Sequence, residues 1–198
     1  MTNRISTLLN ITVLFFLYSC NDAPVTPKPR AYPRIDFPEK KYEAFVHDEC
    51  PYAFEIPTYA HVEKDSFFFG EKAPNDCWIN VMFPGLNGQL YCSYYPVDNQ
   101  EQLLDLIIDG YKVASKHTIK ADYIDEFIIE RDNDVYGMAF EIEGPAASGF
   151  QFFLTDSLQH YFKASLYLNA KVVPDSIAPI IDFLKTDVYR MIETFEWQ

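Results

Sequence analysis

Large apolar side chains alternate with small or acidic residues along residues 136–143, and this alternation restricts the fold of the chain more than any other feature. Tyr136, Met138, Phe140 and Ile142 stand at every second position, which is typical of a strand with one buried face. Residues 161–168 show the same pattern, and residues 123–130 and 150–155 are the two further strands predicted in this region. Four successive strands predict an antiparallel meander.

A hairpin is predicted ahead of the meander. Residues 78–83 and 89–95 have the character of strands and are separated by a Pro-Gly-Leu-Asn-Gly segment at 84–88. Pro-Gly and Asn-Gly pairs are strong turn signals. A short first strand is predicted over residues 54–57, and residues 65–76, which contain a glycine and a proline among polar groups, are predicted as a loop.

Two helices are predicted, one before and one after the meander. Asp98 has Glu101 three residues later, which is the spacing of a capping box. Apolar residues then recur at intervals of three and four and predict one apolar face, made by Leu103, Leu104, Ile107, Ile108, Tyr111 and Ala114. The closing helix is predicted to start near Ser176, a good N-cap, with Pro179 tolerated in its first turn.

The order strand, hairpin, helix, meander, helix predicts the α+β class, with helices laid on an antiparallel sheet. This order is similar to that of Mog1/PsbP-like domains, which are small antiparallel sheets with flanking helices.

The first nineteen residues have the features of an export signal. Arg4 is followed by the apolar run 8–17, which is too short to cross a membrane as a helix, since about 20 apolar residues are needed. A basic start, a short apolar core and a cleavage region indicate a signal peptide. Leu17-Tyr18-Ser19-Cys20 resembles the lipobox of bacterial lipoproteins, so we expect cleavage before Cys20 and lipid on that cysteine. The alternative is an ordinary signal peptide with a chance cysteine.

Residues 20–45 are predicted to be a lipidated tether. They contain prolines at 24, 27, 29, 33 and 38, and prolines at this density favour an extended, semi-rigid spacer. The remaining residues, 46–198, have a length that favours a single globular domain.

The chain is strongly acidic, with a formal net charge of −13. Phosphate backbones are bound by concentrated lysine and arginine, so nucleic acid is not expected as a partner. The same charge argues against a domain that lies flat on anionic lipid. The expected contact with the membrane is therefore the lipid anchor alone.

Three cysteines follow the lipobox, at 50, 77 and 92. An exported protein can keep disulfides, and three cysteines allow three single bridges. We favour Cys50–Cys77, because each lies just before a strand in irregular chain. Cys92 lies inside a hairpin strand and is expected to be a buried free thiol. Three reduced, packed cysteines are the alternative.

Residues that could carry chemistry do not form a known pattern. Ser148 lacks the two flanking glycines of a nucleophile elbow, and the acidic residues between 122 and 134 lack the spacing of a calcium loop. The four histidines are scattered, with no pair at metal-ligand spacing: His47, His61, His117 and His160. We expect no metal, no cofactor, no small-molecule substrate and no enzymatic activity.

Several motifs together resemble the gliding-motility lipoprotein GldD of the Bacteroidota. They lie at residues 50–56 (CPYAFEI), 77–81 (CWINV), 116–122 (KHTIKAD), 135–138 (VYGM), 144–155 and 174–179 (PDSIAP). The resemblance implies a noncatalytic envelope lipoprotein, needed for gliding motility and for the allied type IX secretion machinery, that assembles beside other Gld lipoproteins. It implies diacylglycerol and an N-acyl chain on Cys20. The motifs that carry the resemblance also include Cys50 and Cys77, the two cysteines favoured as a pair.

Attachment to the outer membrane, facing the periplasm, is the expected location, although Asn21-Asp22 after the lipobox leave the choice of membrane open. The alternative function is a surface lipoprotein that binds glycan through exposed aromatic residues. An envelope hydrolase would need a base beside Ser148 or a histidine, and the sequence shows none.

Overall fold

The computed structural model describes residues 34–65, 67–68, 71–169 and 174–198. The predicted signal peptide (1–19), Cys20 and most of the predicted tether lie outside these residues. Residues 35–198 form one structural unit, which begins before the predicted domain boundary at residue 46.

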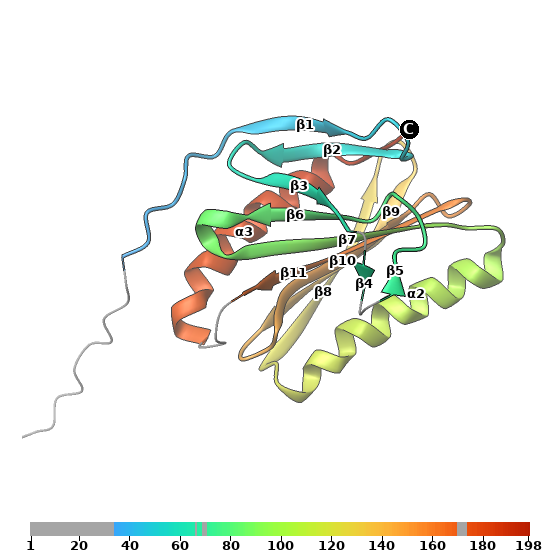
Figure 1. Cartoon of the computed structure of the whole chain (residues 1–198). Coiled ribbons are helices and arrows are strands. Elements are labelled where there is room, and N and C mark those ends of the chain that lie inside the picture. Colours follow the sequence, from blue (N-terminus) through green and yellow to red (C-terminus); the bar gives the residue numbers. More distant parts are fainter. Residues whose placement is uncertain (1–33, 66, 69–70, 170–173) are drawn as a thin grey trace, which may run out of the picture. The chain divides into compact units, whose positions relative to one another are not determined.

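A seven-stranded antiparallel sheet is the centre of this unit (Figure 1). The strand order is β3-β6-β7-β11-β10-β9-β8, so β3 and β8 are the two edges. The bounds are β3 (His61–Lys64), β6 (Ile79–Phe83), β7 (Gly88–Pro96), β8 (Tyr123–Arg131), β9 (Val135–Glu143), β10 (Ser148–Thr155) and β11 (His160–Leu168). The predicted hairpin and meander are confirmed, with strand ends that differ by one or two residues.

The turn of the hairpin contains a short 3-10 helix, η1 (Pro84–Leu86). Asn87 follows it in the left-handed conformation, with φ of 51°. Asparagine tolerates this conformation better than most residues. The Asn-Gly pair in the sequence therefore marks the place where the chain reverses between β6 and β7.

A second, three-stranded sheet has the order β1-β2-β12. It consists of β1 (Tyr42–Val46), β2 (Tyr52–Pro57) and β12 (Glu196–Trp197). Residues 42–45 of β1 fall inside the range predicted as a tether, yet they belong to the folded unit. The physical reason is Phe45, whose ring lies 5.2 Å from that of Phe54 and packs against the core.

The predicted loop 65–76 contains two strands of two residues each, β4 (Phe67–Phe68) and β5 (Glu71–Lys72), which pair with each other. The rest of the region is irregular, as the sequence predicts.

The helix α2 (Gln100–Ser115) follows β7 and continues into a 3-10 turn, η2 (Lys116–Ile119). Its N-cap is Asn99, not the predicted Asp98. The Asn99 side chain accepts from the backbone N–H of Gln102 at 3.0 Å, and the Gln102 side chain accepts from the N–H of Asp98 at 2.7 Å. The capping exchange therefore exists, but one residue later than predicted, with Gln102 in the place given to Glu101.

The helix α3 (Pro174–Thr194) begins two residues before the predicted N-cap Ser176 and contains Pro179. Its buried side is apolar, with Leu184, Val188 and Met191 each at most 3% exposed.

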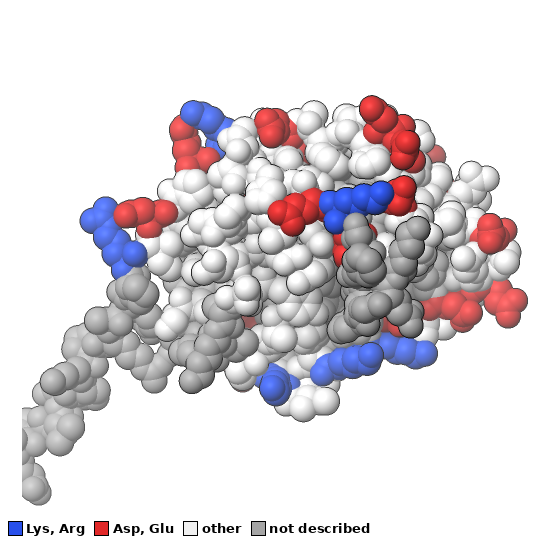
Figure 2. All heavy atoms as spheres, in the orientation of Figure 1, with Lys and Arg blue, Asp and Glu red and all other residues white. Residues whose placement is uncertain are grey.

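The two helices pack on opposite faces of the seven-stranded sheet, because neighbouring residues of one strand belong to different cores. Phe152 of β10 packs in the larger core with α3 and β2, and Phe153 packs in the smaller core with α2. Charged side chains lie mostly outside both cores, and Figure 2 shows acidic groups at several places on one face, with smaller groups of lysine and arginine. The α+β class with helices flanking an antiparallel sheet is confirmed.

Candidate functional site

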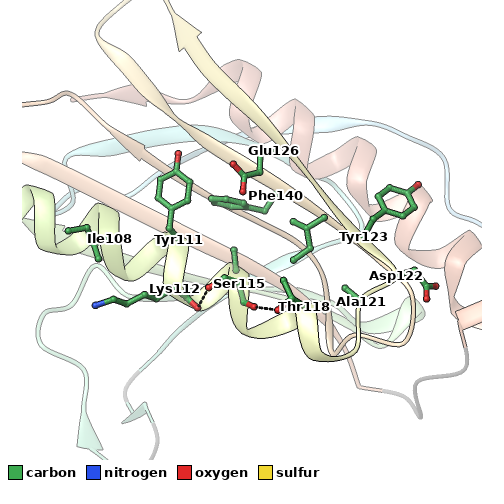
Figure 3. Close-up of a pocket in the computed structure, with 12 residues that line it drawn as sticks. Ile108, Tyr111, Lys112, Ser115, Thr118, Ala121, Asp122, Tyr123, Glu126 and Phe140 are labelled. Carbon is green, nitrogen blue, oxygen red and sulfur yellow. Dashed lines mark hydrogen bonds between the residues drawn. The ribbon is translucent and has the colours of Figure 1, made fainter.

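A cavity of about 620 Å³ lies between α2 and the strands β8 and β9. Phe140, Ala114 and Ile124 contribute apolar lining, and Tyr111 meets the Phe140 ring edge-on at 5.2 Å (Figure 3). Its polar lining is made by Lys112, Ser115, Thr118, Asp122 and Glu126.

This cavity exists because α2 does not bury its whole apolar face. Leu103 and Ala114 are buried, as the helical spacing predicts. Leu104, Ile108 and Tyr111 were predicted on the same face, but they are 56%, 48% and 38% exposed. Six apolar residues span a wider arc than one sheet face can cover, so part of the arc stays open beside β8.

The serine and threonine hydroxyls of the cavity are engaged with backbone carbonyls. The Ser115 hydroxyl donates to the Lys112 carbonyl at 3.0 Å, and the Thr118 hydroxyl donates to the Ser115 carbonyl at 2.7 Å. Neither hydroxyl has a base aligned to activate it, which nucleophilic catalysis requires.

The residues considered for catalysis lie apart from this cavity. Ser148 is fully buried and donates to the carbonyls of Leu166 and Phe150 at 2.9 and 3.2 Å. The histidines contact different neighbours: His61 lies beside Glu63, His117 beside Gln151, and His160 beside Tyr94. Among the described residues, no group of three or more His, Cys, Asp or Glu side chains could hold a metal ion.

The predicted cysteine pair is joined in the structure. Cys50 and Cys77 form a disulfide with a Cα–Cα distance of 5.5 Å, and both are buried. The bridge links the turn before β2 to the chain that enters β6. The Tyr52 hydroxyl also donates to the Cys77 carbonyl at 2.8 Å. The disulfide therefore fastens the three-stranded sheet to the seven-stranded one.

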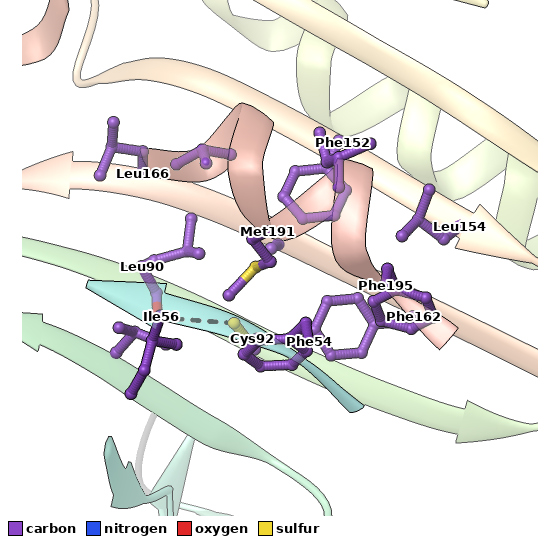
Figure 4. Packing of buried hydrophobic residues seen from close by; sticks show 14 of the residues in the cluster. Phe54, Ile56, Leu90, Cys92, Phe152, Leu154, Phe162, Leu166, Met191 and Phe195 are labelled. Atoms are coloured by element: carbon purple, nitrogen blue, oxygen red, sulfur yellow. Dashed lines mark hydrogen bonds between the residues drawn. The ribbon is translucent and has the colours of Figure 1, made fainter. Parts of the chain in front are cut away.

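Cys92 is a free thiol in the larger core, 1% exposed, between Leu90 and the rings around Phe54 (Figure 4). Burial raises the pKa of this thiol well above its ordinary value. Because the thiolate is the reactive form, a thiol in this environment is inert.

The last residues of the predicted tether are held to α3 by a group that we call the N-terminal clamp: Lys40, Tyr42, Tyr59 and Asp187. Lys40 Nζ lies 2.7 Å from Asp187 Oδ1, and the Tyr42 hydroxyl donates to the same oxygen at 2.8 Å. The Tyr59 hydroxyl donates to Asp187 Oδ2. The carboxylate is almost fully buried and is satisfied by these three donors.

Phe183 extends the contact between this chain and α3. Lys40 Nζ donates to the Phe183 carbonyl at 2.6 Å and lies 3.7 Å from the centre of its ring. The Phe37 ring stacks on Phe183 at 4.4 Å. Burial, together with the hydrogen bond to Asp187, raises the pKa of Tyr42 and of Tyr59. Both tyrosines therefore remain protonated donors over the physiological range.

Sequence reasoning missed the clamp, but one signal was present. Asp187 lies three residues after Leu184 and four before Met191, so a carboxylate stands on the buried stripe of the helix. A charge in that position requires partners.

Residues 22–197 match the family model described as gliding motility lipoprotein GldD. The chain belongs to the GldD family. The clamp, the disulfide and the cavity all lie inside the residues that match this model. Membership makes the protein a gliding motility lipoprotein and associates it with the cell envelope. No described helix is long and apolar enough to cross a membrane.

The chain is similar to the solution structure of cyanobacterial PsbP (CyanoP) from Synechocystis, with a TM-score of 0.47 and 11% identity, covering 87% of this chain and 100% of that one. No curated protein matches the chain.

Proposed function

We propose that this chain is a noncatalytic lipoprotein that assembles or stabilises the gliding motility machinery and the allied type IX secretion system. It acts beside other Gld lipoproteins and is anchored by diacylglycerol and an N-acyl chain on Cys20. The observation that carries this proposal is the match to the GldD family over residues 22–197. The proposed location is the outer membrane, facing the periplasm.

The geometry supports a role in assembly. The cavity surface is mostly apolar, and its serine and threonine hydroxyls are engaged with backbone carbonyls, so it suits binding better than catalysis. The N-terminal clamp fixes the chain that continues from the anchor to α3 through a buried carboxylate. A lipid anchor can then position the whole domain, because the connection is made to its core and not to a surface loop.

Deletion of the gene tests the proposal. Colony spreading and the export of type IX substrates should both stop, and the wild-type gene should restore them. Normal spreading and secretion in the deletion strain would contradict the proposed function.

A Cys20→Ser variant tests the anchor separately. Several acyl chains are needed for stable attachment, because each buried methylene contributes only about 0.8 kcal/mol. The variant should therefore be released from the membrane and should fail to restore gliding, although its domain accumulates and forms the Cys50–Cys77 bridge. Full restoration by the released form would show that the anchor is dispensable.

Glycan binding at the cell surface is the second candidate. Tyr91 and Tyr167 meet edge-on at 5.6 Å on neighbouring strands, and Tyr91 is 37% exposed. Exposed aromatic rings of this kind can stack on sugars. Protease treatment of intact cells separates the candidates: a surface glycan binder should be cleaved, and a periplasm-facing protein should be protected.

A further inference from the structure

The strand β8 is an edge of the seven-stranded sheet whose outer side is uncovered. It pairs with β9 along all nine of its residues, from Tyr123 opposite Glu143 to Arg131 opposite Val135. Among the residues that the structure describes, no strand pairs with its other side. Backbone N–H and C=O groups on that side are free to bond another strand.

β8 carries acidic side chains but lacks the other features that usually protect an edge. Natural edges are kept short, or carry lysine or proline, to prevent pairing with other chains. The opposite edge, β3, has four residues and includes Glu63 and Lys64. β8 has nine residues without lysine, proline or glycine, and its Ile128 is 80% exposed. Tyr123 and Phe127 are 50% and 44% exposed on the same strand.

The cavity described above opens beside this edge. Ile124 and Glu126 of β8 line it, and Phe140, which stands opposite Glu126 on β9, lines it as well. A strand added to β8 would lie about 4.8 Å away, close enough for a large side chain to reach the cavity. Strand addition combines main-chain hydrogen bonds, which give affinity, with pockets for alternate side chains, which give specificity. Both parts are present here.

Charge identifies the kind of strand that fits. Residues 122–134 contain six acidic side chains and a single basic one, Arg131. Arg131 is turned away to donate to the Ile192 carbonyl at 2.5 Å. Like charges placed opposite each other across two strands are destabilising, so a second copy of β8 is a poor partner. A strand with lysine or arginine complements Asp125, Glu126 and Glu130, which are all exposed.

We propose that β8 is a docking edge for an extended segment of a partner protein that carries both apolar and basic residues. The segment continues the sheet beyond β8 and places an apolar side chain in the cavity beside Tyr111. This inference deepens the proposed function, on which it rests, since it names the surface by which the lipoprotein meets its machinery.

Site-specific photo-crosslinking in living cells tests the docking edge with the full lipidated chain. A photoreactive amino acid replaces Glu126, Ile128 or Glu130, one at a time, because these positions share the face that borders the cavity. The matched controls are Glu63 on the other edge and Leu158, which is 68% exposed in a turn. Each modified strain is first checked for colony spreading.

The expected result is one crosslinked peptide of one partner. When the photoreactive residue is moved by two positions along β8, the crosslinked position in that peptide should also move by two residues. That peptide should carry lysine or arginine, and the two control positions should not capture it. Crosslinks that move by three or four residues would indicate a helix and overturn strand addition. Crosslinks to a second copy of the chain, or no crosslinks specific to β8, would also overturn the proposal.

A substitution gives the second measurement. Ile128→Lys adds the residue that protects natural edges, at a position where it buries nothing, and should abolish the crosslinks from Glu126 and Glu130. Leu158→Lys is the control and should leave them unchanged. Since surface substitutions change stability by at most about 0.5 kcal/mol, both variants should unfold like the wild type. Unchanged crosslinking in Ile128→Lys would refute the docking edge.

The two proposals can fail separately. If the deletion strain glides and secretes normally but the stepwise crosslinks appear, the proposed function is wrong and the docking edge stands. If deletion stops gliding but β8 captures nothing, the function stands and this surface is wrong.

Discussion

Asp187→Asn tests the N-terminal clamp, because it removes the charge of the buried carboxylate and keeps its size. The carboxylate accepts from Lys40 and Tyr42 at one oxygen and from Tyr59 at the other. An amide offers one acceptor oxygen and one donor nitrogen. At least one of the three donors would therefore face an NH2 group and lose its acceptor.

The size of the effect follows from burial. Removing one partner of a buried ion pair costs about 3–5 kcal/mol, because the other charge is left uncompensated. The Lys40 side chain is 26% exposed, so its ammonium can turn toward water, and we expect the lower end, about 3 kcal/mol. Each kcal/mol lowers the Tm of a domain of this size by about 2–4 °C. The Tm should fall by roughly 6–12 °C.

Urea unfolding and thermal melts of the purified mature protein measure this cost. Asp182→Asn is the matched control, since it makes the same change at an exposed position of α3 and should cost less than about 0.5 kcal/mol. Hydrogen exchange in β1 should accelerate in Asp187→Asn and not in the control. A cost below about 1 kcal/mol for Asp187→Asn, the value of a surface ion pair, would refute the reasoning.

The remaining predictions concern the disulfide, the loss of stability at acidic pH and one close backbone contact. Replacing Cys50 and Cys77 together by serine should lower the free energy of unfolding by about 3–4 kcal/mol, the chain-entropy value for a loop of this length; an unchanged protein mass on reduction would exclude the bridge. Burial opposes the ionisation of Glu141, but hydrogen bonds from a lysine and a tyrosine of α3 outweigh it and lower its pKa from the ordinary 4.5. The contribution of Glu141 to the free energy of unfolding is therefore full above about pH 4.5 and is lost as the pH falls through its folded pKa. Glu141→Gln should reduce this loss of stability at acidic pH, measured as the free energy of unfolding against pH. An unaltered pH profile would contradict the lowered pKa of Glu141. Gly137→Ala should destabilise by about 3 kcal/mol, because a Cβ there would lie 1.9 Å from a backbone oxygen of β10. Gly85→Ala meets nothing within 4 Å and is its control; equal stability of the two variants would refute the contact.

The elements that sequence reasoning found are those with a complete periodic pattern. β9 and β11 alternate over eight or more residues, and α3 repeats its apolar positions through five turns, so local sequence was sufficient. β1 and β3 were missed for a different reason. Five residues and four residues are too short to show a period, and their pairing with β2 and β6 is decided by tertiary contacts.

The same distinction between local pattern and tertiary contact applies to the sites. The Cys50–Cys77 pairing could be favoured from the positions of strands alone. The clamp could not, since it joins Lys40 and Asp187 across almost the whole domain, and no local pattern links residues so distant. The cavity beside β8 depends on which part of the apolar face of α2 packs on the sheet, and the helical spacing alone does not decide this. Leu104 and Ile108 belong to the predicted apolar face, but they are exposed.

The order β1-β2-β12 has a consequence for when the protein can fold. The central strand of this sheet, β2, pairs on one side with residues 42–46 and on the other with residues 196–197. Phe195, 1% exposed, completes the ring cluster of Tyr52, Phe54 and Phe162. Contacts of such long sequence separation form late, because the loop between them must close first. The larger core therefore cannot close until residues 195–197 have joined it, so a delay in folding is built into its topology. Such a delay suits a chain that is exported as an extended thread, as the proposed anchor on Cys20 requires.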